Sequence, residues 1–131
     1  MSGLGQRFCV LPGNYAVCRL ERESGWPAWA RGPFVSVIST EDETSIVCAA
    51  DVVPPGVRAE RGWRLLKLIG PFPLTAVGVL ASVAAPLAQA GISLLAIATH
   101  DTDYLLVKAE MLDQAVAALC AAGHEQVGLA P

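Results

Sequence analysis

The sequence predicts an α+β protein made of two tandem units, each with strands and helices in the order β-α-β-β-α-β. Three observations lead to this prediction. Residues 63–120 alternate between β-length apolar runs and stretches with helical spacing. A Gly/Pro loop and single glycines separate these runs. Residues 34–48 repeat, 59 positions earlier, the hairpin pattern of the second half.

The second half opens with a predicted strand over residues 63–69. This run ends at Gly70-Pro71-Phe72-Pro73, where two prolines remove backbone donors. From Leu74 to Ala88, apolar side chains recur every three or four residues, which predicts a helix. Gly91 suits the left-handed position that ends such a helix.

A hairpin and a second helix complete this half. Residues 92–99 and 104–108 are rich in strand formers, and His100-Asp101-Thr102-Asp103 supplies turn residues between them. Helical spacing resumes at Glu110 and ends at Gly123. Residues 125–129 are the weakest candidate and would form the last strand of a split βαβ unit.

Residues 71–99 carry no charged side chain and are long enough to cross a membrane. Pro86, Gln89 and the change of period at Gly91 favour instead a helix packed on a sheet.

The first half repeats this pattern in a degenerate form. Residues 15–20 would be its first strand, and residues 8–11 an extra strand joined to that one by a Pro-Gly-Asn turn. Residues 26–31 are too short for more than a turn or two of helix. Residues 51–58 begin as a short helix and become the linker. We therefore divide the chain into units 1–60 and 61–131.

Composition limits the classes of partner. A chain of 131 residues suits two half-size units that share a core. A hydrophobic content of 53% is high for a small soluble chain and suggests self-association. The net charge of -3, with no run of Lys or Arg, predicts neither a nucleic-acid partner nor an anionic membrane surface.

The four cysteines and two histidines predict no metal site. No two of Cys9, Cys18, Cys48 and Cys120 have the close spacing of a zinc or redox motif, and all four stand in apolar runs, where a free thiol acts as a core side chain. The N-terminal residues lack the apolar core of a secretion signal. We therefore expect reduced thiols, a cytoplasmic location and no cofactor.

The same residues also carry a family resemblance. The run from Trp63 to Leu68 with Gly70-Pro71, then Gly78-Val79-Leu80-Ala81, Gly91-Ile92-Ser93 and Thr102-Asp103-Tyr104-Leu105-Leu106-Val107, resembles the small bacterial tandem-ACT proteins related to the CASTOR arginine sensors of animal cells. Thr40-Glu41-Asp42-Glu43 resembles the first-half motif of that family. The resemblance implies two ferredoxin-like units that bind amino acids or similar effectors, commonly where units meet.

The resemblance also implies a site between the Gly/Pro loop and the hairpin turn. Backbone N–H groups near the predicted helix start could hold a carboxylate, and Asp103 could accept hydrogen bonds from an ammonium. Where the animal sensor has an acidic residue this chain has Ala76, so a less cationic amino acid than arginine fits better. The expected effector-binding residues are Pro73, Leu74, Thr75, Val77, Gly78, Thr99, His100 and Asp103.

Each of these residues also has a structural interpretation. Asp103 could only stabilise the turn, Thr99 could be an ordinary strand residue, and Gly78 could let the helix approach the sheet. His100 reads as an exposed turn residue, because no nucleophile is held beside it. The acidic residues 41–43 read as a solvated turn, because calcium-loop spacing is absent.

The sequence thus predicts a non-catalytic regulatory protein, a homodimer that binds an amino-acid-type effector at an ACT-unit interface and acts on a downstream protein. A second interpretation is an interaction module that kept the fold and lost the ligand. We do not expect an enzyme, because no nucleophile–base pair, phosphate loop or metal cluster is present.

Overall fold

A computed structural model of the chain describes residues 5–128. The chain forms two compact units. One consists of residues 13–63, and the other combines the residues before and after that segment. Residues 5–12 therefore belong with the second half of the chain, which differs from the predicted division into units 1–60 and 61–131.

The unit of residues 13–63 is a four-stranded antiparallel sheet in the order β3-β4-β2-β5. Its core joins buried side chains such as Ala16, Cys18, Ile46 and Cys48. Its elements are β2 (Tyr15–Leu20), β3 (Ser36–Ser39), β4 (Thr44–Ala49), the 3-10 helix η1 (Ala50–Val52) and the first residues of β5 (Arg58–Leu68).

The thiol of Cys48 makes this core sensitive to alkaline pH. Burial and, to a smaller extent, the neighbouring Cys18 together raise the pKa of this thiol from the ordinary 9.0 to about 11. Above about pH 9 the unfolded chain loses a proton that the folded chain keeps. The stabilising contribution, up to about 3 kcal/mol, is thus fully present below that pH and is lost as the pH rises to about 11.

We expect urea unfolding to show this loss between pH 9 and 11, and the variant Cys48→Ala to show a shallower pH dependence. The exposed thiol of Cys120 provides the control. Cys120→Ala is expected to keep the wild-type slope, and equal slopes in all three proteins would contradict the prediction.

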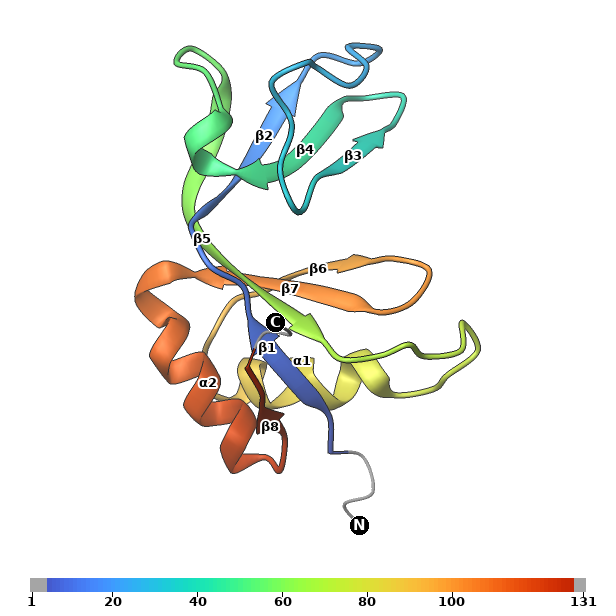
Figure 1. The fold of residues 1–131 in the computed structure, drawn as a ribbon, viewed down its shortest axis with the longest axis vertical. Helices are drawn as coiled ribbons and strands as arrows, with labels where there is room; N and C mark the ends of the chain where they lie inside the picture. Colours follow the sequence, from blue (N-terminus) through green and yellow to red (C-terminus); the bar gives the residue numbers. More distant parts are fainter. Residues whose placement is uncertain (1–4, 129–131) are drawn as a thin grey trace. The chain divides into compact units, whose positions relative to one another are not determined.

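The other unit has the complete order β-α-β-β-α-β. Two helices cover one face of its sheet (Figure 1). Its elements are the end of β5, α1 (Val79–Gln89), β6 (Leu95–Ala98), β7 (Asp103–Lys108), the 3-10 helix η2 (Ala109–Met111), α2 (Leu112–Ala121) and β8 (Glu125–Gln126), joined by β1 (Arg7–Val10) from the N-terminal segment. Of the predicted last strand, Leu129 lies outside the described residues.

The core of this unit lies between the sheet and the helices. From the sheet come Phe8, Leu66, Leu68, Leu105 and Val107, all fully buried. The helices supply the side chains that cover them, Val83, Leu87, Ala115 and Leu119. Side chains along β5 point alternately to opposite faces of the sheet, so Leu66 and Leu68 lie on the same face, the one that the helices cover.

The prediction that residues 8–11 join the strand of residues 15–20 is wrong. β1 does not pair with β2. It pairs antiparallel with the end of β5, with Phe8 opposite Leu68, and parallel with β8, with Phe8 opposite Gln126. β1 thus takes the place beside β5 that the last strand of a β-α-β-β-α-β unit would otherwise occupy.

The predicted duplication is confirmed by strand register. Ser36 pairs with Val47 in one hairpin, and Leu95 pairs with Leu106 in the other, so both partners are shifted by 59 positions. The 3-10 helices η1 and η2 are related by the same shift. The α+β fold with two tandem units is therefore confirmed.

The first unit has lost its first helix. The connection between β2 and β3 spans residues 21–35 and contains no helix. The matching connection of the other unit, between β5 and β6, has 26 residues, 69–94, and contains the eleven-residue α1. Residues 26–31, predicted as a turn or two of helix, form no helix, and only Ala28 and Trp29 make a turn. The indole N–H of Trp26 donates to the Ala30 carbonyl at 2.7 Å and closes this loop locally.

Three further expectations are corrected. The unit boundary predicted after residue 60 falls within a strand, because β5 begins at Arg58 and runs through Gly62 at φ 85°. The helix predicted from Leu74 begins at Val79. Cys120 is exposed, since it lies on the outer face of α2. Among the described helices none is long and apolar enough to cross a membrane, so the uncharged stretch 71–99 is divided between loop, helix and strand.

Candidate functional site

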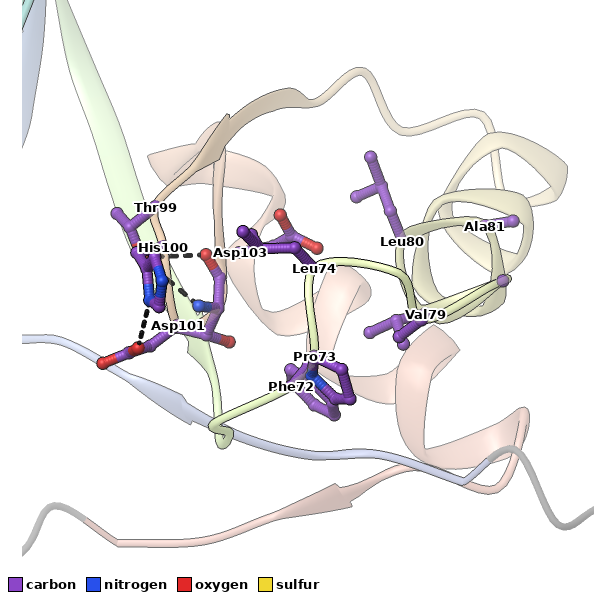
Figure 2. Close-up of a pocket in the computed structure, with 13 residues that line it drawn as sticks. Phe72, Pro73, Leu74, Val79, Leu80, Ala81, Thr99, His100, Asp101 and Asp103 are labelled. Atoms are coloured by element: carbon purple, nitrogen blue, oxygen red, sulfur yellow. Dashed lines mark hydrogen bonds and ion pairs between the residues drawn. The ribbon is translucent and has the colours of Figure 1, made fainter.

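A cavity of about 310 Å³ lies within the unit that contains α1. Three segments form it: the loop before α1, the first turn of α1 and the turn between β6 and β7. Figure 2 shows the turn residues on one side and the start of the helix on the other. The lining residues are Phe72, Pro73, Leu74, Ala76, Gly78, Val79, Leu80, Ala81, Thr99, His100, Asp101, Thr102 and Asp103.

The start of α1 brings backbone donors to this cavity. Gly78 precedes the helix at φ 84° and ψ 2°, a left-handed conformation that favours glycine. No side chain caps the helix, and the Gly78 carbonyl accepts from Ser82 N–H at 3.0 Å. The N–H groups of Val79, Leu80 and Ala81 therefore precede the first intrahelical bond and favour an anion.

The opposite wall is a turn held by its own hydrogen bonds. The N–H and Oγ1 of Thr99 both donate to the Thr102 carbonyl, at 2.8 and 3.0 Å. The buried hydroxyl of Thr102 donates in turn to the Leu68 carbonyl at 2.7 Å. The turn is thus anchored to the end of β5, and its position relative to the sheet is fixed.

The loop before α1 is tied to the same turn. Phe72 N–H donates to the Asp101 carbonyl at 2.8 Å. At Gly70 a Cβ atom would lie 2.8 Å from that carbonyl oxygen, too close for any side chain. Glycine at this position therefore allows the close approach that makes loop and turn two walls of one cavity.

The acidic side chains of the turn differ in their surroundings. His100 Nδ1 lies 2.9 Å from Asp101 Oδ1, and both side chains are largely exposed. Asp103, the first residue of β7, is half-buried and lines the cavity. Among the described residues, its carboxylate has no ion-pair or hydrogen-bond partner. A carboxylate in this position can receive a cationic group of a ligand.

Six of the eight residues expected from the sequence line this cavity. They are Pro73, Leu74, Gly78, Thr99, His100 and Asp103. The other two, Thr75 and Val77, do not line it, and Val77 is 90% exposed. Sequence reasoning missed the first helical turn, because it placed the helix start at Leu74, five residues before Val79. It also missed Asp101 and Thr102, although both belong to the turn it had identified.

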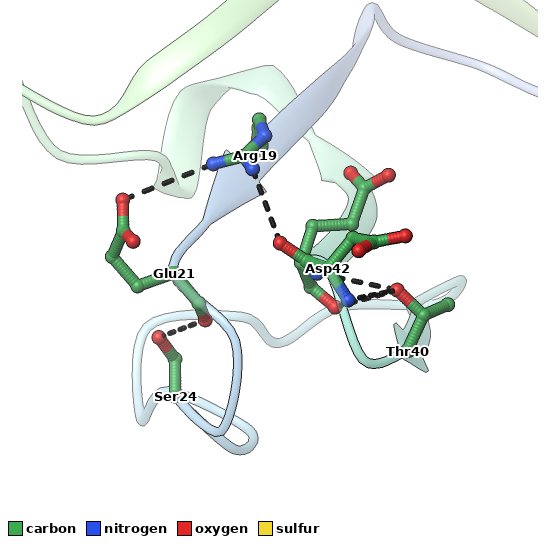
Figure 3. A network of polar contacts seen from close by, with 6 residues as sticks. Arg19, Glu21, Ser24, Thr40 and Asp42 are labelled. Carbon is green, nitrogen blue, oxygen red and sulfur yellow. Dashed lines mark hydrogen bonds and ion pairs between the residues drawn. The ribbon is translucent and has the colours of Figure 1, made fainter.

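The duplicated turn lacks the same constellation. In the other unit, Thr40 makes the hydrogen bonds that Thr99 makes here, including N–H to the Glu43 carbonyl at 2.9 Å. Figure 3 shows Thr40 in this turn, joined to Asp42. The position equivalent to Asp103, however, is Thr44, which is fully buried. The helix equivalent to α1 is also missing there. Within the described part of the chain, the combination of the Asp103 carboxylate and a helix start therefore occurs in one of the two units.

The histidines do not form a metal centre. His124 is buried and accepts Gln6 N–H on Nδ1 at 2.9 Å, while its Nε2 lies 2.7 Å from the Ser82 carbonyl. Both ring nitrogens are thus used in holding the fold. Within residues 5–128, no three His, Cys, Asp or Glu side chains gather as metal ligands would.

Replacing Thr102 with valine is expected to destabilise the protein by about 1–2 kcal/mol, because the buried Leu68 carbonyl loses its donor while the shape is retained. Urea unfolding measures this loss. The exposed Thr75 provides the control, and Thr75→Val should change stability by less than about 0.5 kcal/mol. Equal stabilities of the two variants would show that the anchor is unimportant.

Comparisons with known proteins agree with this architecture. The family model of the ACT domain matches residues 58–121. A second family model, which describes an N-terminal domain, matches residues 13–56. Among curated proteins none matches the chain.

Solved structures extend the comparison over nearly the whole chain. A protein of Agobacterium tumefaciens is 38% identical, with a TM-score of 0.89 over 97% of this chain and 96% of that one. A Vibrio cholerae protein of unknown function, described as a possible transport protein, is 23% identical, with a TM-score of 0.76 over 92% and 91% of the two chains. The regulatory subunit of aspartate kinase from Thermus thermophilus, in its ligand-free form, is 11% identical, with a TM-score of 0.58 over 93% and 95%. The last two likenesses concern the fold alone.

The fold and the family-model match define the class of protein as one that contains an ACT domain, at residues 58–121. The chain as a whole belongs to the same family as the Agobacterium tumefaciens protein.

Proposed function

We propose that this protein is a non-catalytic sensor that binds a free amino acid, or a molecule of similar polar ends, in the cavity between α1 and the β6–β7 turn. One observation carries the proposal. The uncapped start of α1 and the carboxylate of Asp103, which has no partner among residues 5–128, line the same cavity.

The chemistry of the two walls suits a zwitterion. A free amino acid carries a carboxylate, for which the N–H groups of Val79, Leu80 and Ala81 are donors. It also carries an ammonium, for which the carboxylate of Asp103 is an acceptor. A ligand with both groups would use both walls at once, whereas a simple anion or cation would leave one wall unused.

The family supports a regulatory role. The ACT domain is a regulatory fold, and the aspartate kinase subunit with a similar fold is itself a regulatory subunit. The proposed relation to the CASTOR arginine sensors depends on the sequence motifs of the loop and the turn.

The proposal includes a cytoplasmic location and a homodimer in which a unit of the second copy covers the cavity. A downstream protein would bind differently to the ligand-bound and ligand-free forms. Two observations favour a cover. Leu74 at the rim is 73% exposed and the neighbouring Val77 is 90% exposed, and large apolar side chains on a surface commonly mark a contact. The outer edge of β6 could add a strand from another chain. The free cysteines suit a reducing compartment.

The exposed apolar loop also favours a second candidate function, an interaction module that dimerises without a ligand. Titration calorimetry with the twenty amino acids distinguishes the two functions. A sensor should release or absorb heat with at least one of them, and a ligand at 100 times its Kd should stabilise the fold by about 2.7 kcal/mol. With no heat and no shift in melting temperature at millimolar concentration, the sensor function would be abandoned.

A further inference from the structure

We infer that the effector is an amino acid with an uncharged, apolar side chain, and that Leu74 and Leu80 select it. This inference rests on the proposed function and concerns the same cavity. It follows from the distribution of charge over the cavity walls.

All ionisable side chains of the cavity lie on the turn. They are His100, Asp101 and Asp103. The loop and the helix contribute only uncharged side chains to the lining, among them Phe72, Leu74 and Leu80. The cavity therefore has one acidic wall and one apolar wall.

This distribution excludes amino acids with acidic side chains. Among the described residues, neither a Lys nor an Arg lines the cavity. A second carboxylate on the ligand would have no cation to meet and would lie near Asp101 and Asp103, which are of like charge. Binding of aspartate or glutamate would thus leave a charge unpaired.

Cationic amino acids are disfavoured by geometry. When the ligand's carboxylate is at the start of α1 and its ammonium is at Asp103, the two polar walls are both in use. The side chain then extends along the surface that Leu74 and Leu80 provide. A guanidinium or a second ammonium there would lose hydration beside apolar side chains, because the remaining carboxylate, that of Asp101, lies on the opposite wall and contacts His100.

Leu74 and Leu80 are both poorly buried by the chain itself. Leu74 is 73% exposed and Leu80 is 37% exposed, and both line the cavity from different segments (Figure 2). An apolar ligand side chain would cover part of this surface, and its removal from water would favour binding. At about 310 Å³ the cavity is at the lower end of the range of about 300–1,000 Å³ for small-molecule sites, which suits a single amino acid.

A panel of L-alanine, L-leucine, L-methionine, L-arginine and L-glutamate, titrated calorimetrically into the wild-type protein, tests the inference. Leucine or methionine should bind at least about tenfold more tightly than alanine, because each added methylene contributes in an apolar pocket. Arginine and glutamate should bind more weakly than either. If arginine or glutamate binds as tightly as leucine, the inference is overturned and the proposed function stands. If none of the twenty amino acids binds, the proposed function fails and the inference with it.

The variant Leu74→Glu tests the role of the apolar wall. A carboxylate at this exposed position should reduce the affinity for leucine at least about tenfold and reduce the preference for leucine over arginine. Leu74→Gln has the same size without the charge and is the matched control. It should weaken leucine binding without improving arginine binding. Unchanged leucine affinity in both variants would show that Leu74 does not select the ligand.

Discussion

Asp103→Asn is expected to reduce affinity for the effector by about 10- to 100-fold while the fold is retained. Asparagine has nearly the same shape and can accept only a neutral hydrogen bond from the ammonium. Hydrogen bonds to a charged group contribute about 1.5–3 kcal/mol, which corresponds to that change in Kd. Because the carboxylate has no partner within the described part of the chain, its loss should hardly change stability. Calorimetric titration with the amino acid that binds the wild-type protein most tightly measures the effect, and thermal unfolding measures the fold.

Asp113→Asn is the matched control. Asp113 is exposed in the first turn of α2 and does not line the cavity. The same substitution there should leave effector affinity unchanged and cost at most a few tenths of a kcal/mol through the helix dipole. If Asp103→Asn bound the effector as tightly as Asp113→Asn does, the site would have to lie elsewhere on the protein.

The turn wall of the site could be predicted because its chemistry is local. Thr99 and Asp103 stand on either side of a short polar segment between two strand-forming runs, and such a segment forms a hairpin turn. The repeat 59 positions earlier gives the same turn a second time, with Thr40 in place of Thr99. Because the pattern occurs twice, the turn could be predicted without knowledge of the rest of the fold.

The helix wall could not be predicted as well, because apolar spacing alone does not locate a helix start. Leu74 and Val77 fit the helical period, but Ala76 N–H donates to the Pro73 carbonyl at 2.9 Å in a separate turn. Gly78 then adopts φ 84°, which no right-handed helix contains. A glycine just before a helical run is the one signal that could have moved the predicted start to Val79.

The strands that pair with β1 could not be predicted from the sequence. Short-range reasoning joined residues 8–11 to the strand that follows them, because sequential strands commonly pair. In the structure β1 lies between β5 and β8, and its hydrogen bonds join residues more than fifty positions apart, such as Ile69 N–H to the Arg7 carbonyl at 2.9 Å. Nothing in the local pattern of residues 8–11 distinguishes the two arrangements, since either would bury Phe8.

Phe8→Ala is expected to destabilise the unit that contains α1 and α2 by about 3–5 kcal/mol, because it leaves a cavity beneath both helices. Phe8 is fully buried in the core with Leu68 and Leu105, and its carbonyl accepts Val127 N–H at 2.8 Å. Urea unfolding followed by circular dichroism measures the loss. Val77→Ala is the control, since Val77 is 90% exposed and its truncation should cost less than about 0.5 kcal/mol. A loss below about 1 kcal/mol for Phe8→Ala would contradict the prediction, as would a fragment of residues 61–131 with wild-type stability. Either result would mean that the helical unit does not need β1, although β1 separates β5 from β8.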